Sequence, residues 1–281
     1  MKQQFQLAAL DLDGTLFNSQ GQISDITKSA IIKATAAGVT FVISTGRPYQ
    51  GLPLEAMKEL HIHYAITTNG ASIYAVPERK CLDETCMPYE QTAQLLEKLL
   101  TLELHIDLFI KGKSYTPSVC RKAIESMDHL PPSLKEYIWS TRSFFPNLPA
   151  LLREKKVDVQ KIAMNFLLDE NGSPLNQREV IEILKDYPDI CYLSGGFGNL
   201  EFTKKGVSKA HGLSFLCNYL SIPQNETIAC GDSENDIDML QAAQLGVAML
   251  NAPEHVKSQA DEITLSNDED GVAAMIEKWL L

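Results

Sequence analysis

The sequence predicts an α/β protein whose core is a doubly wound, mainly parallel sheet, with a second, α+β domain inserted into it. The first and last thirds of the 281-residue chain alternate apolar strands with helical segments. This alternation is typical of a parallel sheet with helices on both faces. The middle of the chain breaks the alternation. We therefore expect a core formed by residues 1–83 and 194–281 and an inserted domain formed by residues 84–193.

In the first third, each expected strand leads into a turn or the start of a helix. The apolar run at residues 5–10 reads as a buried strand, and the next helix is expected to begin at Ser24 and to end at Gly38. The further elements expected here are a strand at 39–43, a helix from Pro48 to about residue 60, a strand at 64–67, and a tight turn at Asn69-Gly70 into a strand at 72–76.

The last third repeats the alternation, whereas the inserted segment mixes its elements. Gly195-Gly196 would give backbone freedom at a hinge near residues 193–195, with a second hinge near residues 83–84. The elements expected beyond residue 84 are a helix at 89–102, strands at 104–110, 161–168 and 190–193, a helix that opens near Lys209, and strands at 227–230, 246–249 and 262–265.

The composition is that of a soluble globular protein. The chain is 44% hydrophobic and 22% charged, and its net charge is −11. A nucleic-acid partner is not expected, because phosphate backbones need a basic face. No apolar run reaches the length of a membrane span, and residues 1–4 lead into a strand and not into a signal-peptide core. The six cysteines lack Cys-x-x-Cys spacing, so we expect reduced thiols in a cytoplasmic protein.

The segment Asp11-Leu12-Asp13-Gly14-Thr15-Leu16 is the strongest chemical signal in the chain. Residues two apart on a strand point to the same side, so Asp11 and Asp13 are expected to converge if the extended geometry persists. Two carboxylates this close repel and need a cation or a shared proton. A divalent metal together with a phosphate group would account for the arrangement; a surface Asp-Gly turn is the plain alternative.

Polar residues also follow the strands expected at 39–43 and 227–230. Thr45 and Gly46 can offer a hydroxyl and backbone N–H groups to an anion, although a plain strand-to-helix turn has the same composition. Asp232 follows the later strand. In open parallel sheets, ligands bind beyond the carboxyl ends of the strands, where these residues would lie.

Three further candidate site residues lie at the starts of expected helices. Lys209 stands where the helix dipole disfavours a cation, which hints at an anionic partner, although a solvated lysine is the plain alternative. Asn235 and Asp236 fall in the first turn of the helix after Asp232, where acidic residues are ordinary caps.

Taken together and in this order, these motifs resemble the haloacid-dehalogenase-like (HAD) hydrolase superfamily, and within it the Cof-type sugar-phosphatase branch. The matching motifs are Asp-x-Asp-Gly-Thr-Leu, Thr-Gly-Arg-Pro, the lone lysine and Gly-Asp-x-x-Asn-Asp. Leu250 is one departure, because many relatives carry glycine there. The resemblance implies a Rossmann-like core and an inserted cap domain that sets substrate specificity.

The resemblance also implies a role for each motif residue. Asp11 would be the nucleophile that forms an aspartyl phosphate, and Asp13 the general acid and base. Mg²⁺ would be bound by the Asp11 side chain, the Asp13 backbone carbonyl and the Asp232 side chain. The remaining roles would be phosphate binding by Thr45, the Gly46 amide, Lys209 and Asn235, and support of Lys209 or a metal-bound water by Asp236.

Arg47 has two open interpretations, a phosphate clamp or a structural element of its loop. For the whole chain, we expect a Mg²⁺-dependent phosphatase of small phosphorylated metabolites, sugar phosphates first, with no nucleic-acid or membrane partner. A phosphomutase or phosphotransferase with the same intermediate is the nearest alternative. A non-catalytic phospho-aspartate signalling module is another, but receiver domains are about half this length. We expect a monomer or a weak homodimer.

Overall fold

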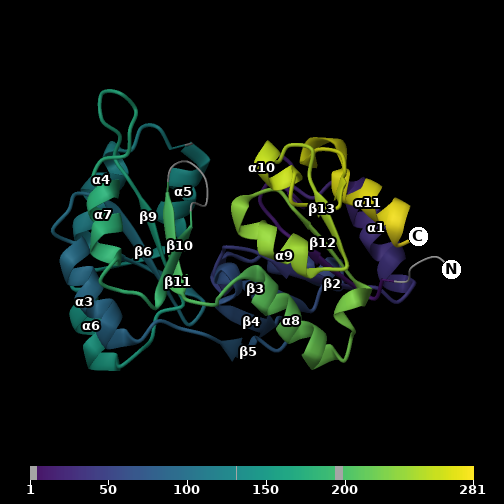
Figure 1. Cartoon of the computed structure of the whole chain (residues 1–281), viewed down its shortest axis with the longest axis horizontal. Helices are drawn as coiled ribbons and strands as arrows, with labels where there is room; N and C mark the ends of the chain where they lie inside the picture. The colour runs from purple at the N-terminus through teal and green to yellow at the C-terminus, as the bar shows by residue number, and fades with distance from the viewer. Residues whose placement is uncertain (1–4, 131, 194–198) are drawn as a thin grey trace. The chain divides into compact units, whose positions relative to one another are not determined.

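The structure is a computed structural model that describes residues 5–130, 132–193 and 199–281. It divides into two compact units, which are labelled by element in Figure 1. The first unit comprises Met1–Arg47, Leu52–Asp83 and Val207–Leu281, and the second comprises Pro48–Gly51 and Glu84–Gly206. The first unit is therefore built from segments on both sides of the second in sequence.

An eight-stranded sheet forms the centre of the first unit, in the order β14-β13-β12-β1-β2-β3-β4-β5. From β14 to β3 every neighbouring pair is parallel, and β4 pairs with β3 in the antiparallel direction. The strands are β1 (Leu7–Leu10), β2 (Thr40–Ser44), β3 (Tyr64–Thr67), β4 (Ser72–Ala75), β5 (Lys80–Glu84), β12 (Thr227–Gly231), β13 (Leu245–Ala248) and β14 (Glu262–Ile263).

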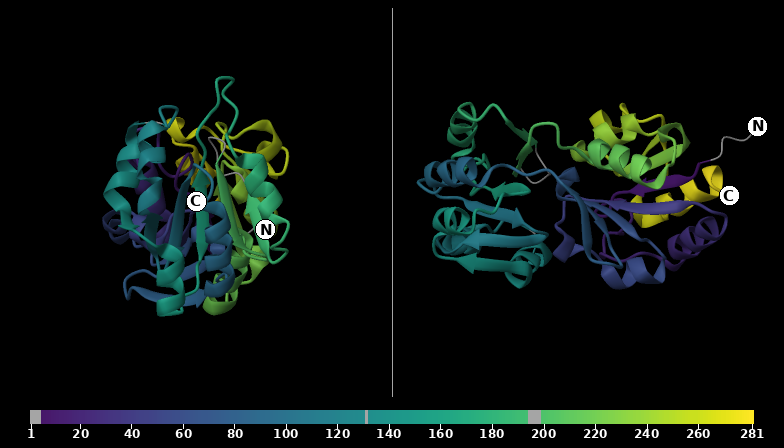
Figure 2. Two further views of the ribbon diagram at one scale, coloured as in Figure 1. Left: turned by 90° about the vertical axis from the view of Figure 1, so that its left-hand side faces the viewer. Right: turned by 90° about the horizontal axis from the view of Figure 1, so that it is seen from below.

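Helices cover both faces of this sheet (Figure 2). On one face, α8 packs beside α9, and their apolar residues contact Leu7 and Ala9 of β1. α1 and α11 pack together. The helices of this unit are α1 (Asp25–Ala36), α2 (Leu54–Glu59), α8 (Lys209–Leu220), α9 (Ile237–Ala242), α10 (Glu254–Lys257) and α11 (Gly271–Trp279). The predicted doubly wound, mainly parallel core is confirmed.

Strand β1 lies between β2 and β12, and its register fixes where the polar residues gather. Leu10 is level with Ile43 of β2 and with Cys230 of β12. All four residues of β1 are fully buried, so burial on both faces holds this register. The residues that follow the three strands therefore emerge side by side at one edge of the sheet.

The second unit contains a six-stranded sheet in the order β10-β11-β9-β6-β7-β8. One face is covered by α3, α6 and α7, whose leucines pack on Ile106, Leu108 and Ile162. The strands are β6 (His105–Ile110), β7 (Lys113–Pro117), β8 (Arg142–Phe145), β9 (Lys161–Asn165), β10 (Ile190–Leu193) and β11 (Leu200–Lys204). The helices are α3 (Tyr89–Leu99), α4 (Arg121–Ser126), α5 (Pro132–Thr141), α6 (Leu148–Lys155) and α7 (Gln177–Leu184).

The boundary expected at residue 193 is wrong, because β11 belongs to the second unit. β11 pairs with β10 and β9 in the antiparallel direction, and the unit ends only at Gly206. The short segment Pro48–Gly51 also joins this unit, where Gln50 N donates to the Gly112 carbonyl at 2.8 Å. The hinge glycines Gly195 and Gly196 lie outside the described residues.

The bounds of two expected elements also need correction. The helix expected from Pro48 is two pieces, a 3₁₀ turn at Tyr49–Gly51 and α2, and β9 ends at Asn165. In the described part of the chain, no helix is both long and apolar enough to cross a membrane. All six cysteines are free thiols.

Candidate active site

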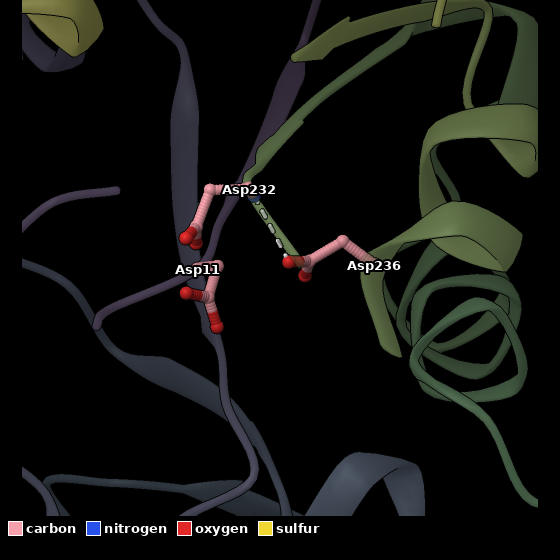
Figure 3. Close-up of side chains that lie close together, drawn as sticks. All are labelled: Asp11, Asp232 and Asp236. Atoms are coloured by element: carbon pink, nitrogen blue, oxygen red, sulfur yellow. Dashed lines mark hydrogen bonds between the residues drawn. The ribbon is translucent and has the colours of Figure 1, made fainter. Parts of the chain in front are cut away.

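Three aspartates meet where β1 and β12 end. Asp11 follows β1, Asp232 follows β12, and Asp236 closes the 3₁₀ turn Glu234–Asp236. One carboxylate oxygen of each lies within 4.8 Å of the others, and Figure 3 shows the three side chains together. The backbone aligns them, because Asp11 N donates to the Cys230 carbonyl at 3.0 Å and so continues the parallel ladder.

Lys209 connects two of the three carboxylates. Its Nζ lies 2.6 Å from Oδ1 of Asp11 and 2.6 Å from Oδ1 of Asp236, and its side chain is fully buried. Burial alone would lower the pKa of Lys209, but the charges of both carboxylates outweigh it and raise the pKa above the usual range. The lysine is therefore a fixed ammonium at the start of α8, where Ser208 caps the helix.

Asp236 is held by the backbone that precedes it. Its Oδ2 accepts hydrogen bonds from Asp232 N at 3.1 Å and from Ser233 N at 3.0 Å. A Cβ on Gly231 would lie 2.4 Å from Cγ of Asp236, so only glycine fits there. Asp236 thus braces both Lys209 and the loop that carries Asp232.

Asp232 is less buried than Asp11 and Asp236. The hydroxyl of Thr15 donates to its Oδ1 at 3.1 Å. Burial, followed by the charge of Asp236, raises the pKa of Asp232 to about 6. Burial also raises the pKa of Asp11 well above its usual range, against the opposing charge of Lys209. Three carboxylates against one ammonium leave an excess of negative charge that a cation would neutralise.

The Asp13 side chain takes part in an ion pair instead of the three-carboxylate cluster. Nε of Arg47 donates to its Oδ2 at 2.8 Å, and Nη2 donates to its Oδ1 at 2.6 Å. The Asp13 side chain is 57% exposed. The charge of Asp13 still contributes to the raised pKa of Asp232, so Asp13 influences the cluster electrostatically. The expected convergence of the Asp11 and Asp13 carboxylates is therefore wrong, because Asp13 pairs with Arg47 and the carboxylates that meet Asp11 are those of Asp232 and Asp236.

Thr45 and Asn235 are linked through one turn of the chain. Thr45 is buried, and its carbonyl accepts from Asn69 N at 3.1 Å. The Asn235 side-chain amide donates to Oδ1 of Asn69 at 3.2 Å. Gly46 follows Thr45 in the loop after β2. Thr45 and Asn235 are therefore both held by hydrogen bonds to Asn69.

The supporting residue Asn69 belongs to the tight turn that the sequence predicts at Asn69-Gly70. It has a φ of +59° and is nearly fully buried. A Cβ on the next residue, Gly70, would lie 2.0 Å from the Ser208 carbonyl, so the turn packs directly under the start of α8. An Asn-Gly pair signals positive φ, but only the tertiary contact with α8 shows that this pair supports the site.

A second polar cluster lies within the other unit. Asp107 is buried, and it accepts from Thr116 and from Nε of Arg142 and contacts His105 Nε2 at 2.9 Å. Burial would raise the pKa of Asp107, but His105 and Arg142 outweigh it and hold the pKa below its usual range. No sequence motif marks this cluster, because its residues lie on three separate strands, β6, β7 and β8, that only the sheet pairing brings together.

A buried lysine between Asp11 and Asp236, on a parallel sheet that an inserted unit interrupts in sequence, defines a hydrolase of the HAD-like class. The sequence profile described as haloacid dehalogenase-like hydrolase matches residues 8–276, so the chain belongs to this family. The resemblance drawn from the motifs is thereby confirmed.

Individual relatives match over the full length. Phosphatase YwpJ of Bacillus subtilis is 31% identical, with 98% of this chain and 99% of that protein covered. The 5-amino-6-(5-phospho-D-ribitylamino)uracil phosphatase YcsE of the same species is also 31% identical, with 98% and 96% covered. A solved haloacid dehalogenase-like hydrolase from B. subtilis superimposes with a TM-score of 0.82 at 30% identity, covering 97% of this chain and 99% of that one.

Proposed function

We propose that this chain is a cytoplasmic, Mg²⁺-dependent phosphatase that hydrolyses small phosphorylated metabolites through an aspartyl phosphate. The observation that carries the proposal is the position of Lys209, whose ammonium lies 2.6 Å from Asp11 within a cluster of carboxylates. A carboxylate nucleophile with an adjacent fixed cation is suited to attack a phosphate group, because the cation offsets the charge of both reactants.

The reaction would proceed in two steps at Asp11. In the first step, an oxygen of Asp11 bonds to phosphorus and the bond to the leaving alcohol breaks. Asp13 donates a proton to that alcohol. In the second step, water attacks phosphorus, Asp13 takes the water proton, and Asp11 is released with inorganic phosphate. Dividing a very slow hydrolysis into two easier steps is the usual benefit of covalent catalysis.

The donor set fits a hard divalent cation. Carboxylate oxygens of Asp11 and Asp232 lie within the 4.8 Å cluster, and Mg²⁺ prefers oxygen ligands. Asp11, Asp232 and the Asp13 backbone carbonyl would hold the ion, which when bound would shield the nucleophile from the negative phosphate. Asp236 is committed to Lys209 and to backbone N–H groups, so we assign it a supporting role.

Four groups would bind the transferring phosphate. Thr45 offers a hydroxyl, Gly46 a backbone N–H, Lys209 its ammonium and Asn235 its side-chain amide. Groups fixed before the substrate arrives stabilise transition-state charge without reorganisation. The contacts through Asn69 keep Thr45 and Asn235 in place.

The substrate class rests on the inserted unit and on the relatives. A cap that closes over the core excludes bulk water and admits small molecules. YcsE is named for a phosphorylated ribityl compound. We therefore place sugar phosphates and polyol phosphates first.

A phosphate-release screen tests this function. Purified protein is supplied with Mg²⁺ and a panel of sugar phosphates, polyol phosphates, nucleotides and a phosphopeptide. Release from sugar or polyol phosphates, lost on chelation and restored by Mg²⁺, is the expected result. An isomerised phosphate ester without free phosphate would indicate a mutase instead. A preference for the phosphopeptide would contradict the small-molecule assignment.

A further inference from the structure

The ion pair between Arg47 and Asp13 is a two-point contact next to the three-carboxylate cluster. Nε and Nη2 of Arg47 each donate to a different oxygen of Asp13, at 2.8 and 2.6 Å. A two-point contact of this kind fixes the orientation of the carboxylate as well as its distance. A single lysine contact would leave the carboxylate free to rotate.

Both partners are themselves anchored. The Arg47 backbone N donates to the Thr45 hydroxyl at 3.1 Å, and its carbonyl accepts from Thr68 N at 2.9 Å. The guanidinium carbon lies 5.4 Å from the centre of the Phe17 ring, which favours a cation. Arg47 therefore projects from the loop after β2 toward Asp13, with an aromatic ring beside its guanidinium.

Asp13 is held from the other side by its own turn. Asp13 forms an isolated bridge with Phe17, and Phe17 N donates to the Leu12 carbonyl at 2.8 Å. The Phe17 carbonyl accepts from the Asn267 side chain at 3.0 Å. With its backbone fixed by these contacts, the remaining freedom of Asp13 is the rotation of its side chain, which Arg47 restrains.

We propose that Arg47 is a positioning residue that aims the Asp13 carboxylate at the attacking water during breakdown of the aspartyl phosphate. The inference rests on the proposed function. In this step the water oxygen bonds to phosphorus, and the bond from phosphorus to the Asp11 oxygen breaks with its electron pair returning to Asp11. The water proton passes to Asp13, and inorganic phosphate leaves. Arg47 donates only, so both Asp13 oxygens stay acceptors, as a proton acceptor requires.

An aryl phosphate separates this role from direct phosphate binding. Nitrophenolate leaves without needing a proton, so its initial burst reports attack by Asp11, and the later steady rate reports breakdown of the aspartyl phosphate. If Arg47 acts through Asp13, Arg47→Met should keep the burst rate within about threefold of wild type. It should lower the steady rate about 10- to 100-fold, the scale expected for a misplaced catalytic group.

A double-mutant cycle supplies the decisive comparison. Asp13→Ala should show a burst followed by a slow steady rate, and Arg47→Met added to Asp13→Ala should change neither phase. The steady rate of Arg47→Lys should lie between those of Arg47→Met and wild type, because lysine keeps the positive charge but cannot make the two-point contact. Arg153→Met, which removes an arginine paired with Glu90 and Glu97 in the other unit, is the control and should match wild type.

Thermal unfolding of the same samples separates a loss of folded protein from a change in either kinetic phase. An Arg47 effect that persists in the Asp13→Ala background, or a burst that falls with the steady rate, overturns the inference in favour of direct phosphate binding. If Arg47→Met does not fold, the same criteria apply to Arg47→Lys. A wild-type steady rate in Asp13→Ala alone would instead refute the acid–base role of Asp13 in the proposed function.

Discussion

Gly14 lies so close to Asp232 that a Cβ on Gly14 would stand 2.4 Å from the Asp232 Oδ2. Gly14 also has a φ of +85°, which an L side chain adopts only with strain. The turn after β1 thus depends on glycine for two separate reasons, its backbone conformation and the space that a carboxylate of the site occupies.

The effect of the clash can be separated from the effect of the strain. Gly14→Ala should displace the Asp232 carboxylate and raise the Mg²⁺ concentration needed for half-maximal activity by about tenfold or more, the scale of a disturbed metal-site contact. Gly21→Ala is the matched control, because Gly21 has a φ of +72° and open space around the added Cβ. Equal shifts in Mg²⁺ dependence for both variants would contradict the steric role of Gly14.

Asp11→Asn should abolish turnover while the protein stays folded. The amide keeps the shape of the side chain but cannot act as the nucleophile, so we expect a loss of at least about a thousandfold. Phosphate release and thermal unfolding measured together check this. Asp25→Asn, an exposed acidic residue in the first turn of α1, is the control. Substantial turnover by a folded Asp11→Asn protein would refute the aspartyl-phosphate mechanism.

Lys209→Met should destabilise the first unit strongly. Removal of the ammonium leaves the buried Asp11 and Asp236 without the cation that lies 2.6 Å from each. Breaking a buried ion pair by removing one partner typically costs about 3–5 kcal/mol. Urea unfolding should therefore show a clear fall in the midpoint, and adding Asp236→Asn should recover part of it. A double variant less stable than Lys209→Met would argue against charge imbalance as the cause.

The raised pKa of Asp232 gives stability a definite pH dependence in metal-free protein. Because its pKa is about 6 when folded, against 3.8 for an ordinary aspartate, the native state between these two pH values holds a proton that the unfolded chain has lost. The Asp232 contribution to the free energy of unfolding is therefore present below pH 3.8 and is lost as the pH rises toward 6.

Urea unfolding of wild type and Asp232→Asn checks this sign. The variant should gain stability relative to wild type between pH 5 and pH 7 in the presence of a chelator. Mg²⁺ should stabilise wild type more at pH 7 than at pH 5, because the ion then competes with no proton. A stability difference that does not change with pH would exclude Asp232 as the titrating group.

The sequence predicted the elements that depend on local pattern and on the parallel sheet. Asp11 and Asp232 could be placed at the same edge because each follows an apolar strand of the expected parallel sheet, and the carboxyl ends of parallel strands lie at one edge. The partner of Asp13 could not be predicted, because nothing in the motif places Arg47 opposite it in three dimensions. Similarly, the alternating residues of β11 are typical of a strand, but only its pairing with β9 and β10 assigns that strand to the second unit.

The position of β1 between β2 and β12 has a consequence for the order in which the chain is made. Residues 7–10 and 40–44 leave the ribosome early, whereas residues 227–231 follow only after the whole second unit. Until then, the wholly apolar β1 has an unpaired edge, which is the kind of surface that recruits other chains. The edge of β1 that pairs with β12 therefore stays unpaired while most of the chain is being synthesised. Newly made chains should for this reason depend on chaperones more than finished ones do.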